Sequence, residues 1–312
     1  MGGQVLLFSL INSLHKTYLI MPQIFIFNFH RVSNEYSPAF PPIPIKTFER
    51  VVRFLNRQFV IIPQEALLEK LPITTKKDFC IITFDDGYAD FAEYALPILE
   101  EYKIPIVLHI VTDVATTGKM FWTQRLNKIV ETYYQLETPI ECSSLSRTYT
   151  MKNDKEVEMT ALDIYLRLLE DANRIEIINE LASKINATVP ETKMLTWQDL
   201  KSLPKNIVTI GSHAHTHNNL REMSSVEISN ELSESFNLIK KNIGIEPLSI
   251  AYPNGQYSEE INTLASDIGY KLFYTCDGCK NALTQRRLFH RANLYNRQLW
   301  KNILKIELWK FR

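Results

Sequence analysis

The stretch "FCIITFDDGYADFAEYALPILEEYKIPIVLHIV" (79–111) decides the fold class. It begins with a mostly apolar run at 79–84 that predicts a buried strand. A helical pattern follows over 90–103, and a second apolar run over 104–111 predicts another strand. A strand, a helix and a strand in this order predict two parallel strands joined by a crossover helix. The segment is therefore read as one βαβ unit of an α/β protein.

The same alternation extends to both sides of this unit. Strands are expected at 23–30, 206–213, 247–253, 271–276 and 287–294, and helices at 45–58, 225–244 and 258–270. Residues 119–195 break the rhythm, because they are polar, helical in pattern and without a strong strand. We predict one catalytic domain over 1–312, built as a barrel or an open sheet, with 119–195 as a helical insertion.

Composition narrows the function classes. The chain has 35 Lys plus Arg and 35 Asp plus Glu, so no overall positive field attracts nucleic acid, and no basic aromatic tract does so locally. Four cysteines in 312 residues fit a reducing compartment. No apolar segment reaches the roughly 20 residues of a membrane-spanning helix, and the N-terminus lacks the features of a cleaved signal peptide. A cytoplasmic or inner-membrane-associated location is expected, with no nucleic acid partner.

Polar residues gather where three of the predicted strands end. Asp85 and Asp86 follow the strand at 79–84, "GSHAHTH" covers 211–217, and "YPNG" covers 252–255. In folds of parallel strands, functional residues collect at the carboxyl ends of the strands. These three clusters are therefore the candidate site.

The histidine cluster fits a metal site. His213 and His217 are four residues apart, so one helical turn or a tight loop can direct both rings at one point, whereas His215 would point elsewhere on a helix. Two imidazoles and one carboxylate form a common catalytic zinc shell. The alternative is a solvated loop that happens to be rich in histidine.

Two neighbouring carboxylates repel each other, and this raises the pKa of one of them. A divalent cation removes the conflict if one of the pair coordinates it, and the other can then act as a base. The alternative is a solvated turn in which an Asp caps the next helix. Gly87 suits a turn that needs a permissive backbone.

Three motifs in order resemble the polysaccharide deacetylases, carbohydrate esterase family four. They are "TFDDG" (83–87), "GSHAHTH" (211–217) and "AYPNG" (251–255), and together they are specific. "FNFHRVS" (27–33) resembles the first strand of many members. The likeness covers most of 24–118 and 195–295.

This resemblance implies a distorted (β/α) barrel of about seven parallel strands and metal-dependent removal of N-acetyl groups from amino sugars. Asp85 matches the catalytic base of the family. Asp86, His213 and His217 match its metal ligands, for Zn²⁺ in the first place, with Co²⁺ or Ni²⁺ as substitutes.

The third motif implies a substrate groove, in which the backbone N–H at Asn254 helps to hold the oxyanion. The candidate substrate-binding residues are Tyr252, Pro253, Asn254, Gly255 and Trp122. Ala251 stands where many members carry an arginine that pairs with the base. Arg291 can supply that charge from another strand, or it can be a surface residue.

The general acid has two candidates. His290, in "LFH", lies at the end of the chain where the family has its last motif, and His30 ends the first predicted strand on the same rim. Both remain open from the sequence.

The tail at 298–312 predicts an amphipathic helix. Trp300, Leu304, Leu308 and Phe311 share one face, and lysines lie off it. Such a helix either docks on the barrel or makes peripheral contact with an anionic membrane.

We expect a hydrolase that acts on carbon–nitrogen bonds. Its substrate would be an N-acetylated sugar in a polysaccharide, an oligosaccharide or a lipid-linked glycan of the cell envelope. An amidase of the same fold that acts on a non-sugar amide, or a carbohydrate-binding relative without activity, are the alternatives.

Overall fold

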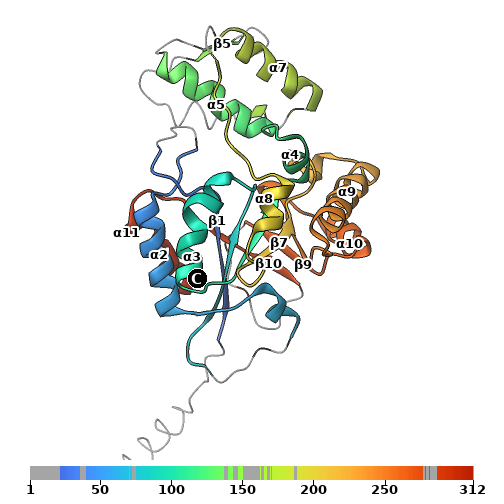
Figure 1. Cartoon of the computed structure of the whole chain (residues 1–312). Coiled ribbons are helices and arrows are strands. Elements are labelled where there is room, and N and C mark those ends of the chain that lie inside the picture. The colour runs from blue at the N-terminus through green and yellow to red at the C-terminus, as the bar shows by residue number, and fades with distance from the viewer. Residues whose placement is uncertain are drawn as a thin grey trace, which may run out of the picture.

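The computed structural model describes residues 22–35, 40–69, 71, 75–136, 140–142, 147–149, 162, 165–166, 169, 171–185, 188–276, 278, 281 and 287–311. Its centre is a parallel sheet that curls into a barrel, with helices packed on the outside (Figure 1). The predicted fold class is confirmed.

The barrel strands follow the apolar runs of the sequence. Their bounds are β1 (Ile24–Phe29), β3 (Phe79–Phe84), β4 (Ile106–Ile110), β7 (Val208–Ser212), β8 (Ser249–Ala251) and β9 (Leu272–Thr275). Each pairs in parallel with its neighbour in the order β1-β3-β4-β7-β8-β9. The short β2 (Val60–Ile61) adds to the first part of β3.

One stretch near the end of the chain closes the ring. β10 (Leu288–His290) pairs with β9, and β11 (Ala292–Asn293) pairs with β1, so the two segments join opposite ends of the sheet. Arg291 alone separates them. If β10 and β11 count as one strand, the eight segments along the sheet make seven strands around the barrel. The expected number of about seven is therefore correct.

The helices cover the outside of the barrel. They are α2 (Ile45–Gln58), α3 (Leu96–Glu101) after the π-helix η2 (Phe91–Ala95), α8 (Trp197–Ser202), α9 (Ser225–Ile243), α10 (Glu259–Ile268) and α11 (Leu299–Phe311). The 3₁₀ turns are η1 (Gln64–Leu68), η3 (Leu220–Glu222) and η4 (Pro253–Gly255). α9 begins at a capping box of Ser224 and Glu227 and ends at Gly244 in a left-handed conformation.

Residues alternate between the two faces of each strand, and this alternation builds the site. Phe25, Phe27 and Phe29 belong to the core between β1 and the helices. Ile24 and Ile26 belong to a second core cluster that contains alternate residues of β3, β4, β8 and β9. Further along the same strands, toward their carboxyl ends, the inward-facing side chains are polar. This polar layer consists of Asn28, Thr83, Asp85, His109 and Arg291.

The insertion has a core of its own. It contains α5 (Trp122–Gln135) and α7 (Asp171–Ser183), together with an antiparallel pair, β5 (Ile140–Cys142) and β6 (Arg147–Tyr149), and α4 (Thr112–Thr117) precedes it in the chain. Figure 1 shows α5 and α7 beyond the end of the barrel. The expectation is a helical segment without a strong strand, and the two strands of the hairpin have only three residues each, which is too short for a periodic signal in the sequence.

The C-terminal helix α11 has apolar side chains on two faces. Asn302, Ile306 and Trp309 are buried, and α11 packs beside α2. Trp300, Leu304 and Leu308 are 60%, 48% and 51% exposed. Within the ranges that the structure describes, no helix is both long and apolar enough to cross a membrane.

Candidate active site

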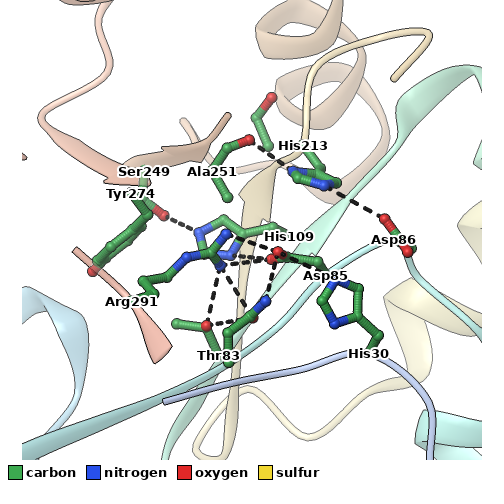
Figure 2. Close-up of polar contacts among 12 residues, drawn as sticks. His30, Thr83, Asp85, Asp86, His109, His213, Ser249, Ala251, Tyr274 and Arg291 are labelled. Carbon is green, nitrogen blue, oxygen red and sulfur yellow. Dashed lines mark hydrogen bonds and ion pairs between the residues drawn. The ribbon is translucent and has the colours of Figure 1, made fainter. Parts of the chain in front are cut away.

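Asp85 is held inside the barrel by an arginine from the closing strand. Arg291 Nη1 donates to Asp85 Oδ1 at 2.8 Å, and Nη2 donates to Oδ2 at 2.8 Å (Figure 2). Both side chains are buried. Arg291 can reach this point because it lies between β10 and β11, where the strand crosses from β9 to β1. Such a two-pronged pair fixes both the position and the plane of the carboxylate.

Other polar groups complete the surroundings of Asp85. Asn28 Nδ2 donates to Asp85 Oδ2 at 2.9 Å, and the Asn28 Oδ1 atom accepts from Thr83 Oγ1 and from Arg291 Nη1. Burial alone would raise the pKa of Asp85, but the Arg291 guanidinium holds that pKa well below its ordinary value. Asp85 is therefore a carboxylate near neutral pH.

Asp86 belongs to a second cluster. Its Oδ1 atom lies 3.4 Å from His213 Nε2 and 3.5 Å from His217 Nε2. The three side chains are buried, and their candidate ligand atoms all lie within 4.8 Å of one another. Two ligands at about 2.1 Å from a tetrahedral ion lie about 3.4 Å apart, so the donor set suits a divalent metal such as zinc.

The backbone separates the two neighbouring carboxylates. Asp86 has φ 76° and Gly87 has φ 82°, so two successive residues are left-handed. This conformation is costly for a residue with a side chain and is typical of functional sites. The turn leaves Asp85 with Arg291 in the barrel interior, while Asp86 meets the histidines (Figure 2).

His213 is oriented by the strand next to its own. Its Nδ1 atom donates to the Ala251 carbonyl oxygen at 2.7 Å, which leaves the Nε2 lone pair facing Asp86. Burial lowers the pKa of His213 to about 4, so the ring is neutral near pH 7. Ala251, which stands where many members of the family carry an arginine, thus contributes its backbone carbonyl to the site.

The sequence profile of the polysaccharide deacetylases matches residues 73–273. The match includes Asp85, Asp86, His213 and His217, while Asn28 and Arg291 lie outside it. The chain belongs to the polysaccharide deacetylase family. The resemblance seen in the three motifs is therefore confirmed.

A curated relative and two solved structures are similar to this chain. The chain is 25% identical over 149 residues to YxkH of Bacillus subtilis, and the match covers 46% of this chain and 53% of YxkH. It thus spans about half the length of that curated relative. The structure of the Streptococcus pyogenes deacetylase PplD in complex with acetate matches with a TM-score of 0.60 at 16% identity, over 91% of this chain and 97% of PplD. IcaB from Ammonifex degensii matches with a TM-score of 0.59 at 13% identity, over 92% and 97%. These two structures support the fold.

The two histidines proposed as general acids lie in different places. His30 Nε2 is 4.0 Å from Asp85 Oδ2, and the ring contacts Phe40 edge-on. Burial lowers the pKa of His30 to about 4, although Asp85 acts in the opposite direction. His290 Nδ1 lies 3.1 Å from Thr275 Oγ1, and alternation along the strand turns its ring away from the face that carries Arg291.

The third motif forms a tight turn beside His213. Tyr252 is fully buried, and its hydroxyl donates to Asn262 Oδ1 at 2.5 Å, so this side chain supports the turn from within. Pro253 is also buried, and Asn254 has φ 57°. A Cβ at Gly255 would lie 2.7 Å from the backbone nitrogen of Cys276, which explains the glycine.

Trp122 packs inside the insertion, where the Arg174 guanidinium lies 4.5 Å from the centre of its ring. Its neighbour Phe121 stacks on His217 instead, with ring centres 4.3 Å apart. Arg174 also donates to Asn218 Oδ1 at 3.2 Å. The insertion thus contacts the loop that carries a candidate metal ligand.

The sequence analysis missed Asn28, His109 and Phe121. The first two carry a readable signal, because each is a polar residue in an otherwise apolar strand and falls on the inward row. Phe121 carries none, since its contact with His217 joins segments almost one hundred residues apart.

Proposed function

We propose that this chain hydrolyses the N-acetyl amide of an amino sugar and releases acetate and a free amine. One observation supports the proposal most directly. The ion pair of Asp85 with Arg291 lies next to the cluster of Asp86, His213 and His217. Family membership supports deacetylation of a carbohydrate.

The residues that would hold a divalent metal are Asp86, His213 and His217. When bound, the ion would supply Lewis acid activation of the amide carbonyl and of water. The neutral ring of His213, with its Nε2 atom free of the Ala251 bond, fits this role. Zn²⁺ is the first candidate, and Co²⁺ or Ni²⁺ can substitute.

Asp85 is proposed as the general base. As the oxygen of water bonds to the acetyl carbon, Asp85 accepts a proton from that water. Because Arg291 keeps the carboxylate ionised, Asp85 is ready to accept a proton throughout the neutral pH range. The backbone N–H at Asn254, in the turn after β8, would stabilise the negative charge that develops on the carbonyl oxygen.

His30 is the favoured general acid. Its Nε2 atom lies 4.0 Å from Asp85 Oδ2, a distance that one bridging water or a small side-chain movement can close. His30 would receive the proton from Asp85 and pass it to the leaving nitrogen as the bond between carbon and nitrogen breaks. His290 is the weaker candidate because its ring bonds to Thr275.

Acetate release tests the proposal. The substrate panel holds chitooligosaccharides, peptidoglycan fragments, polyprenyl-linked N-acetyl sugars and a non-sugar N-acetyl amide. Acetate should appear with at least one sugar, disappear with a chelator and return with Zn²⁺ or Co²⁺. Asp85→Asn should lower kcat by about 10²- to 10⁴-fold. Asp267→Asn, on the exposed face of α10, is the matched control and should not change kcat.

Each alternative predicts a different result in the same assay. Acetate from the non-sugar amide alone would identify an amidase on another substrate. Sugar binding without acetate release, in protein loaded with metal, would identify a binding protein. Full activity of Asp85→Asn would exclude Asp85 as the base.

We also propose that α11 makes peripheral contact with an anionic membrane, which suits a lipid-linked substrate. Trp300, Leu304 and Leu308 are exposed together, and Lys301 lies over the Trp300 ring at 5.7 Å. Residues 299–312 carry four basic side chains and one acidic side chain. Two copies of this face would bring like charges together, whereas anionic lipid would neutralise them.

Vesicle co-sedimentation tests this contact. The full chain should sediment with phosphatidylglycerol vesicles more than with phosphatidylcholine vesicles. The triple variant Trp300→Ser, Leu304→Ser, Leu308→Ser should stay in solution, while the control Val226→Ser, at a position 69% exposed on α9, should sediment. Equal sedimentation of the triple variant, or a dimer in solution that it disrupts, would exclude the membrane contact.

A further inference from the structure

A buried histidine lies beneath Asp85 inside the barrel. His109, on β4, is fully buried. Its Nδ1 atom lies 3.3 Å from Asp85 Oδ1, and its Nε2 atom lies 3.0 Å from Ser249 Oγ on β8 (Figure 2). The ring therefore links two strands that are not neighbours in the sheet.

The chemistry of the two partners fixes the tautomer of His109. The carboxylate of Asp85 can only accept, while the Ser249 hydroxyl can donate. A neutral ring has one N–H, so the tautomer that suits both partners carries the hydrogen on Nδ1, facing Asp85, while Nε2 accepts from Ser249. The Nδ1 contact at 3.3 Å is a polar contact that lies outside hydrogen-bond geometry in this structure. Burial lowers the pKa of His109, which agrees with a neutral ring.

The neighbouring strand leaves room for this ring. A Cβ added at Gly211, on β7, would lie 2.4 Å from His109 Cδ2 and 2.8 Å from Ser249 Oγ. Real Cβ atoms do not approach other atoms so closely. Gly211 therefore permits the contact between His109 and Ser249.

The contacts of Asp85 are unequal at its two oxygen atoms. Oδ1 faces Arg291 Nη1 and His109 Nδ1, both from within the barrel. Oδ2 accepts from Arg291 Nη2 and Asn28, and it is the atom nearer to His30. The His109 Nδ1 contact on the Oδ1 side, together with Arg291 and Asn28, thus resists tilting of the carboxylate plane away from this position.

We propose that His109, oriented by Ser249, is a positioning residue that fixes the plane of the Asp85 carboxylate and so keeps one of its oxygens directed toward the reaction. This inference rests on the proposed function of Asp85 as the base. His109 does not touch substrate, and it acts only through the carboxylate. An error of about 1 Å in the placing of a catalytic group can cost about 100-fold in rate.

Three substitutions at His109 distinguish the loss of its N–H donor from the loss of its packing volume. His109→Phe keeps the ring but removes both nitrogens. His109→Gln places an amide near the Nε2 position, whereas His109→Asn places one near Nδ1 and can still donate to Asp85. In the metal-loaded protein, we expect kcat on the best acetylated sugar to fall about 10- to 100-fold for Phe and Gln, with KM unchanged, and to recover substantially for Asn.

Two further measurements accompany these variants. The first controls for a general loss of stability, and the second detects the tautomer of His109. Tyr270→Phe removes another buried hydroxyl, which donates to the Leu232 carbonyl, and should leave kcat unchanged. ¹⁵N shifts of the histidine rings in the wild-type protein should show His109 protonated at Nδ1, and Ser249→Ala should perturb its Nε2 signal.

The outcomes distinguish this inference from the proposed function. If Asp85→Asn abolishes activity but His109→Phe retains full kcat, the function stands and the positioning role is wrong. Protonation of His109 at Nε2, or an Asn variant as slow as Phe, would also overturn the role. If Asp85→Asn is fully active, the assignment of the base fails first.

Discussion

At the scale of single residues, the neighbouring carboxylates Asp85 and Asp86 are kept apart by backbone conformation. Asp86 and Gly87 are both left-handed, so one carboxylate meets Arg291 and the other meets two histidines. The repulsion expected between adjacent charges is thereby reduced, because Asp85 faces a guanidinium while Asp86 faces a cluster that could hold a metal ion.

Replacing Arg291 tests the anchoring of Asp85. Arg291→Lys keeps the charge but loses the two-pronged geometry, and we expect kcat/KM to fall by about 100-fold. Arg291→Met leaves Asp85 buried without its counter-charge and should lower the free energy of unfolding by about 3–5 kcal/mol. Acetate assays and denaturant titrations measure the two effects. Arg287→Lys, at an exposed position nearby, is the control, and an equal loss there would contradict the specific role of Arg291.

His30 makes the stability of the metal-free protein depend on pH. Its pKa is about 4 in the fold and 6.5 in an unfolded chain, so the fold favours the neutral ring. This contribution is complete above pH 6.5 and is lost as the pH falls toward 4. His30→Phe should reduce the loss of unfolding free energy over that range by about 3 kcal/mol at most. Parallel stability curves for the two proteins in chelator would contradict the lowered pKa.

At the scale of elements, the strands and outer helices follow directly from apolar periodicity. The predicted helix at 45–58 and the predicted strand at 79–84 have the same bounds in the structure. The strand predicted at 287–294 is instead divided at Arg291. Periodicity identifies an element, but it does not state which neighbour that element pairs with.

The same limit explains what could be predicted of the site. Asp85, Asp86, His213 and His217 lie in motifs that can be read locally, and the structure brings them together. The contact of His109 with Ser249 depends on the register of strands that are far apart in the sequence. It therefore emerges only when the barrel is assembled.

Gly211 provides a test of packing between strands. Gly211→Ala should lower the free energy of unfolding by about 1–3 kcal/mol, because the added Cβ meets the His109 ring. In a His109→Ala background, the same change should cost less, since the contacts with the His109 ring are gone and the close approach to Ser249 Oγ remains. Denaturant titration of the four proteins gives the coupling, and equal costs in both backgrounds would contradict the contact.

At the scale of the whole molecule, the insertion and the barrel have separate apolar cores but share the site. Phe121 covers His217, and Arg174 donates to the neighbouring Asn218. The insertion is therefore placed to support a candidate metal ligand.

Removing this support should weaken metal binding. Phe121→Ala exposes the His217 ring and should raise the Kd for Zn²⁺ about 10-fold, as expected for loss of a neighbour that orients a ligand. Competition with a chromogenic chelator measures the affinity. Tyr165→Ala, at an exposed position of the insertion, should bind normally. An unchanged Kd for Zn²⁺ in Phe121→Ala would show that this contact of the insertion does not support the candidate metal site.

The closing strand also has a consequence for synthesis. A ribosome delivers the N-terminal part of a chain first, so residues through His217 emerge long before Arg291. Until that arginine arrives, the barrel is open between β9 and β1, and Asp85 has no counter-charge. An incomplete chain would therefore hold every residue of the candidate metal cluster while the proposed base, Asp85, still lacked its arginine partner. If Asp85 is the base as proposed, activity would thus require one of the last described strands to be translated.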